Sequence, residues 1–72
     1  MNRKDKVYHE VLEHVIRLLG ERHPIEMIAA CLMVIAQRLY KTHLSPEEYK
    51  KIMKIAAEVE VVPYDIRKGT LH

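Results

Sequence analysis

Apolar side chains recur at three- and four-residue steps along the first part of the chain. This spacing places them on one side of an α-helix, with charged residues on the other. The pattern predicts a first helix over residues 5–19, and Gly20, which adopts the left-handed conformation cheaply, is expected to end it. The recurring apolar positions are Tyr8, Val11, Leu12, Val15, Leu18 and Leu19.

A second helix is predicted over residues 24–41. Pro24 fits the first position of a helix, where its missing N–H costs nothing. His23 before it is expected to be the capping residue, with Glu26 reaching back to the cap. The side of this helix that faces the subunit core is predicted to hold Ile28, Leu32, Ile35 and Leu39.

The third helix has the clearest start signal, because Ser45 and Pro46 are followed by Glu48 at the capping-box position. Leu44 and Tyr49 on either side match a hydrophobic staple, and the helix is predicted over residues 46–60. Pro63 disfavours helix just before it, so residues 61–72 are expected to be an extended tail. The fold class is therefore all-α, with a three-helix domain over residues 1–60.

The middle helix is apolar on a second face as well as on its core face. Its longest apolar run, residues 27–36, is shorter than the roughly 20 residues of a membrane span, so we expect no membrane association. Two flanking helices cannot cover the whole circumference, and we predict that the second face is buried in a homo-oligomer, with a dimer favoured. Burial by the first helix and the tail within a monomer stays open. The predicted interface residues of this helix are Met27, Ala30, Cys31, Met33 and Val34.

The tail carries Tyr64 and Ile66, which are predicted to pack on a neighbouring subunit or partner. A frayed terminus is the alternative for the residues that follow.

Composition narrows the class of protein. Twelve Lys and Arg residues against ten Asp and Glu residues give a net charge of +2, too slight to imply nucleic acid or an anionic membrane. The single cysteine, Cys31, excludes an internal disulfide and suits a reducing compartment, so we expect a cytoplasmic protein. Charged residues interrupt the N-terminal stretch, which indicates that it is not a signal peptide.

The candidate chemical sites are weak. His9 and His14 are five positions apart, so they do not share a helix face as the paired histidines of zinc proteases do. No base lies beside Cys31 in the sequence, and no glycine-rich phosphate loop is present. The sequence therefore predicts no catalytic residue, no metal site and no cofactor, and indicates that the protein is not an enzyme.

Two alternative functions depend on basic residues. The second and third helices could form a helix-turn-helix-like dimer that binds nucleic acid, although Glu47 and Glu48 would then face the bases. Alternatively, Arg38, Lys41 and Tyr40 could hold an anionic nucleotide between subunits. The residues predicted to contact an anion or nucleic acid are Arg38, Lys41, Lys50, Lys51 and Lys54.

The middle of the chain resembles short helical open reading frames of phages and prophages. The resemblance is carried by His23-Pro24-Ile25-Glu26, Ala29-Ala30, Arg38-Leu39-Tyr40-Lys41-Thr42 and Leu44-Ser45-Pro46-Glu47-Glu48-Tyr49. It implies a small accessory factor that binds a host or phage component, in the host cytoplasm if a phage encodes it. The leading interpretation is an oligomeric helical binding protein that acts by protein–protein contact.

Overall fold

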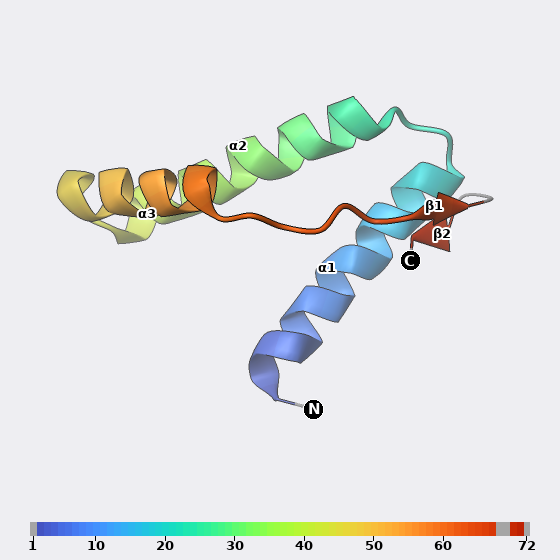
Figure 1. Ribbon diagram of the computed structural model, residues 1–72, viewed down its shortest axis with the longest axis horizontal. Coiled ribbons are helices and arrows are strands. Elements are labelled where there is room, and N and C mark those ends of the chain that lie inside the picture. The colour runs from blue at the N-terminus through green and yellow to red at the C-terminus, as the bar shows by residue number, and fades with distance from the viewer. Residues whose placement is uncertain (1, 68–69, 72) are drawn as a thin grey trace. The chain divides into compact units, whose positions relative to one another are not determined.

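The computed structural model describes residues 2–67 and 70–71 (Figure 1). Its three helices confirm the predicted helical architecture. A pair of two-residue antiparallel strands closes the tail, which the sequence analysis did not anticipate; Ile66 pairs with Leu71 and Arg67 with Thr70. No helix in the described part of the chain is both long and apolar enough to cross a bilayer. The elements are α1 (Arg3–Gly20), α2 (Ile25–His43), α3 (Pro46–Glu58), β1 (Ile66–Arg67) and β2 (Thr70–Leu71).

The chain divides into two units, and the division falls within α2. The first unit comprises residues 1–29 and 64–72, with α1, the first turn of α2 and the strand pair. The second unit comprises residues 30–63, with most of α2 and all of α3.

In the first unit, α1 begins two residues earlier than predicted. The Asn2 side chain supplies the cap, since its Oδ1 accepts a hydrogen bond from the Asp5 N–H at 2.9 Å. The predicted apolar stripe is half-buried only in its second half, while Tyr8 and Val11 near the start are exposed. The half-buried residues of α1 are Leu12, Val15, Ile16, Leu18 and Leu19.

The end of α1 differs from the prediction in a specific way. Gly20 is the last helical residue, and the left-handed residue is Arg22, with a φ of 69°. The Arg22 N–H donates to the Leu19 carbonyl at 3.0 Å, and the His23 N–H donates to the Leu18 carbonyl at 3.2 Å. These are the two hydrogen bonds of a Schellman motif, which places the left-handed position two residues after Gly20. The prediction that Gly20 supplies the left-handed stop is therefore wrong.

The start of α2 is shifted by one residue. The Pro24 carbonyl accepts the first helical bond, from the Ile28 N–H at 3.1 Å, so Pro24 occupies the capping position predicted for His23. At its other end α2 continues to His43, two residues beyond the prediction. The Thr42 hydroxyl donates to the Arg38 carbonyl at 2.7 Å, a bond of a side chain back to the preceding turn of the helix.

The predicted core face of α2 is confirmed at one position. Ile28 is buried, with 7% of its surface exposed, and it is the one buried side chain among residues 2–65. The prediction that Leu32, Ile35 and Leu39 form the core of a single chain is wrong, because all three are exposed. In the second unit, α3 lies instead near the side of α2 that carries Lys41, where its Tyr49 ring meets the lysine ammonium.

Helix α3 follows its predicted start and ends at Glu58, two residues before the predicted end. Val59 is extended, with φ −70° and ψ 127°, and its N–H makes the last helical bond to the Ile55 carbonyl at 2.9 Å. The apolar side chains of α3 are half-buried at Tyr49, Ile52 and Met53, whereas Ile55, and Val59 just after the helix, are exposed.

Whether Arg22 is the left-handed residue can be tested by the direction in which a glycine there changes stability. Arg22→Gly should raise the free energy of unfolding by about 0.5–1 kcal/mol. The left-handed conformation costs a non-glycine residue about 1–2 kcal/mol, but glycine loses more backbone entropy on folding, which cancels part of the gain. Urea unfolding at one fixed protein concentration measures it.

The companion variant is Gly20→Ala. A Cβ built on Gly20 meets nothing within 4 Å, and the residue is helical, so the alanine should also stabilise the protein, by about 0.5–1 kcal/mol. Destabilisation by Gly20→Ala would contradict this turn and restore Gly20 as the left-handed residue.

Candidate functional site

The five α2 residues predicted to form an interface are all exposed in the single chain. Met33 and Val34 are 63% and 52% exposed, and Ala30 and Cys31 beside them are also exposed. Met27, in the first unit, is exposed as well.

The exposed apolar surface of α2 is wider than the predicted interface face. In the second unit it also includes Leu32, Ile35 and Leu39, which are 39%, 54% and 65% exposed. These three belong to the face that was expected to be the subunit core. We call Leu32, Met33, Val34, Ile35 and Leu39 together the α2 surface. These residues lie on more than one side of the helix, and large apolar side chains exposed in this number usually mark a contact with another molecule.

The two predicted contact residues of the tail are Tyr64 and Ile66. Tyr64 is exposed. The backbone of Ile66 pairs with Leu71, whereas its side chain lies outside the described part of the structure.

The predicted basic residues Arg38, Lys41, Lys50, Lys51 and Lys54 are all exposed. Lys41 also contacts α3, where its Nζ lies 5.1 Å from the centroid of the Tyr49 ring. This is a cation–π contact, and Lys41 makes no ion pair with a carboxylate in the described part of the chain.

A small cavity of about 300 Å³ lies where α2 meets α3. It is lined by Lys41, Leu44, Pro46 and Tyr49. Each of these residues was predicted to have another role. Lys41 was expected to contact an anion or nucleic acid, Pro46 to start the third helix, and Leu44 and Tyr49 to form a hydrophobic staple. The staple pair Leu44 and Tyr49, with Lys41 one turn before Leu44, is the signal from which the cavity could have been found.

The capping box that forms one side of this region is confirmed. The Ser45 N–H donates to Glu48 Oε1 at 3.0 Å, and the Glu48 N–H donates to Ser45 Oγ at 3.2 Å. These interactions with Ser45, and the nearby charge of His43, hold the pKa of Glu48 below its ordinary value. The Glu48 carboxylate is thus committed to fixing the start of α3 (Pro46–Glu58).

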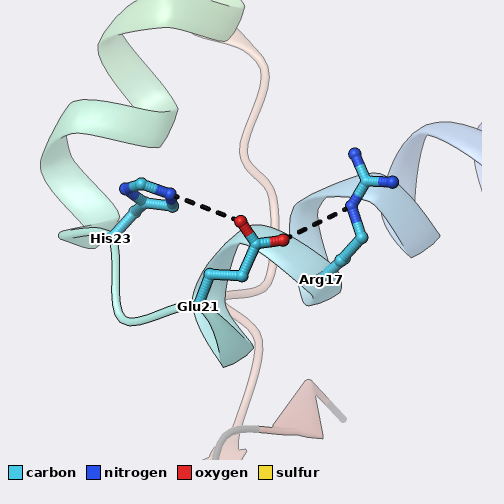
Figure 2. A network of polar contacts seen from close by, with 3 residues as sticks. All are labelled: Arg17, Glu21 and His23. Atoms are coloured by element: carbon cyan, nitrogen blue, oxygen red, sulfur yellow. Dashed lines mark ion pairs between the residues drawn. The ribbon is translucent and has the colours of Figure 1, made fainter.

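A polar network surrounds the Schellman turn in the first unit (Figure 2). The Glu21 carboxylate lies 3.7 Å from Arg17 Nε through one oxygen and 3.6 Å from His23 Nε2 through the other. All three side chains are about half-exposed, so each pair contributes at most about 1 kcal/mol. His23 therefore contacts Glu21, rather than serving as the predicted cap of α2.

The histidines and acidic residues do not converge elsewhere. In the described residues, no three His, Cys, Asp or Glu side chains are close enough to hold a metal ion. The ring of His9 instead contacts Tyr8 edge-on, with 5.7 Å between ring centroids. The arrangement that remains is an apolar surface on α2 and a small cavity with one cation.

Comparison with known proteins gives no further direction, since no protein-family model, curated protein or solved structure matches the chain.

The lowered pKa of Glu48 makes a prediction about pH. A carboxyl group whose pKa is lower in the folded chain than in the unfolded chain stabilises the fold above its unfolded value. That contribution should be present at neutral pH and lost as pH falls below the ordinary value of 4.5 and through the folded pKa. Thermal melts between pH 7 and pH 3 measure the loss.

The matched variant is Ser45→Ala, which removes the hydroxyl that accepts the Glu48 N–H. It should cost about 1 kcal/mol at pH 7 and leave most of the acid dependence in place, because the backbone N–H of residue 45, the largest cause of the lowered pKa of Glu48, remains. Glu48→Gln, which cannot ionise, should remove this acid dependence, and an unchanged pH profile in Glu48→Gln would show that it arises elsewhere.

Proposed function

We propose that this protein is a small helical binding module that self-associates through the α2 surface and acts by contact with other proteins. The observation that carries the proposal is the exposure of large apolar side chains on two sides of α2, with Leu39 at 65% and Met33 at 63%. A helix that is apolar nearly all round is normally buried nearly all round. In this proposal, the cover comes from another chain.

A second copy is the occupant favoured by the chemistry of the surface. The ten residues from Met27 to Ala36 carry no charge, so the surface offers no electrostatic pattern by which a differently charged partner would be selected. Two-fold pairing matches one such surface with itself and closes the assembly. Ala30, small and exposed, lets the helices approach closely.

An accessory role is the wider part of the proposal. It rests on the resemblance of the middle of the chain to phage open reading frames, which implies binding to a host or phage component. In this proposal, self-association uses α2, and the remaining exposed elements contact the other protein.

The direct test is Val34→Glu. A carboxylate placed in an apolar interface costs at least about 2 kcal/mol, so the dissociation constant of the oligomer should rise at least about thirtyfold. Sedimentation equilibrium over a range of concentrations measures the constant, and circular dichroism should show unchanged helix content, because Val34 is exposed in the single chain.

The matched control is Lys51→Gln, which lowers the net charge by the same amount at an exposed position of α3. It should leave the dissociation constant unchanged. Self-association through α2 would be refuted by equal effects of the two variants, or by a wild-type chain that sediments at 8.5 kDa at every concentration tested.

A further inference from the structure

We propose that the cavity at the α2–α3 turn binds a small apolar group that carries a carboxylate, such as the last residue of a peptide or a small organic acid. The cavity lies within one unit of one chain, between the last turn of α2 and the first turn of α3. The proposal is therefore separate from self-association, and each can fail without the other.

The apolar part of the ligand is indicated by the walls. Leu44, Pro46 and Tyr49 form three of the four lining residues. The volume of about 300 Å³ is at the lower end of the range for small-molecule pockets, about 300–1,000 Å³. A space of this size suits one branched aliphatic or one aromatic group.

The carboxylate is indicated by Lys41. Its ammonium is held 5.1 Å from the centroid of the Tyr49 ring and makes no ion pair in the described part of the chain, so its N–H donors remain available to an anion. A hydrogen bond between ions beside apolar walls is stronger than one in open water. One lysine matches one carboxylate, whereas the other basic residues do not line the cavity.

The cavity is also held in shape before a ligand arrives. The reciprocal hydrogen bonds between Ser45 and Glu48 fix the start of α3, and Pro46 fixes one backbone angle beside them. The one carboxylate of the capping box, that of Glu48, already accepts a hydrogen bond from the Ser45 N–H. Preorganisation of this kind reduces the entropy lost on binding.

The test is a titration of the ¹⁵N-labelled full chain, followed by amide chemical shifts. The ligands are N-acetyl-leucine, its carboxamide, and a hexapeptide ending in leucine with either a free or an amidated C-terminus. Both free acids should cause saturable shifts confined to residues 41–49, with a dissociation constant on the order of millimolar for the small acid. The affinity of each amide should be at least about tenfold lower than that of the matching acid, because the ion pair is lost.

The arms of the experiment separate the two sources of the carboxylate. Binding of the free-acid peptide at least tenfold tighter than N-acetyl-leucine would support a peptide C-terminus, and equal affinities would support a small acid. The proposal is overturned if no ligand gives saturable shifts at residues 41–49, or if the amides bind as well as the acids.

The matched variants are Lys41→Met and Lys51→Met, which remove the same charge from two lysines. Lys41→Met keeps the length of the side chain and should weaken binding of the acids about tenfold, whereas Lys51→Met should leave it unchanged. Dispersed spectra of both variants establish that each is folded. Equal affinities of the two variants would exclude Lys41 as the anion-binding group.

Discussion

The short connection between α2 and α3 is the constraint on which the second unit depends. Only Leu44 and Ser45 separate the two helices, and the Ser45–Glu48 capping box fixes the direction in which α3 starts. Tyr49, one residue after the box, then meets Lys41 on α2. A helix held at this side of α2 cannot also cover Ile35 and Leu39, which are exposed. One local motif therefore sets which residues of α2 the start of α3 meets, while Ile35 and Leu39 stay exposed.

The two candidate sites, the cavity at the α2–α3 turn and the α2 surface, both follow from this arrangement. Where α3 touches α2, an aromatic ring, a lysine and two apolar residues line an open cavity of about 300 Å³. Elsewhere, α2 presents leucine, isoleucine, valine and methionine side chains to solvent. The stabilisation available to a single chain of this size is small, because a short chain buries only a modest part of its surface. Covering the open side with a second copy would supply what the single chain lacks.

Local signals in the sequence predicted local structure well. Ser45, Pro46 and Glu48 interact with one another over a few residues, so their pattern was sufficient to locate the start of α3 and its capping box. The end of α1 was harder, because Gly20 and Arg22 are both near the stop and the choice of left-handed residue depends on the path that the chain takes into α2. Backbone preference alone favours Gly20 as the left-handed residue, but Gly20 is the last residue of α1. The predicted core at Leu32, Ile35 and Leu39 failed for a similar reason, since periodicity identifies an apolar face but does not say whether it packs within the chain or against another one. The cavity was not predicted as a site, because Lys41 and Tyr49 are eight positions apart and come together only through the turn between them. The staple pair Leu44 and Tyr49 located that turn but did not by itself indicate a cavity.

Cross-linking through the single cysteine tests the central claim most directly. Cys31 is exposed and lies beside the α2 surface, so a short bismaleimide should join the Cys31 thiols of two copies if α2 pairs with α2. The wild-type chain at low micromolar concentration should give mainly covalent dimer by mass spectrometry, and the yield should fall sharply in urea. A product that is almost entirely singly modified monomer under native conditions would contradict the account.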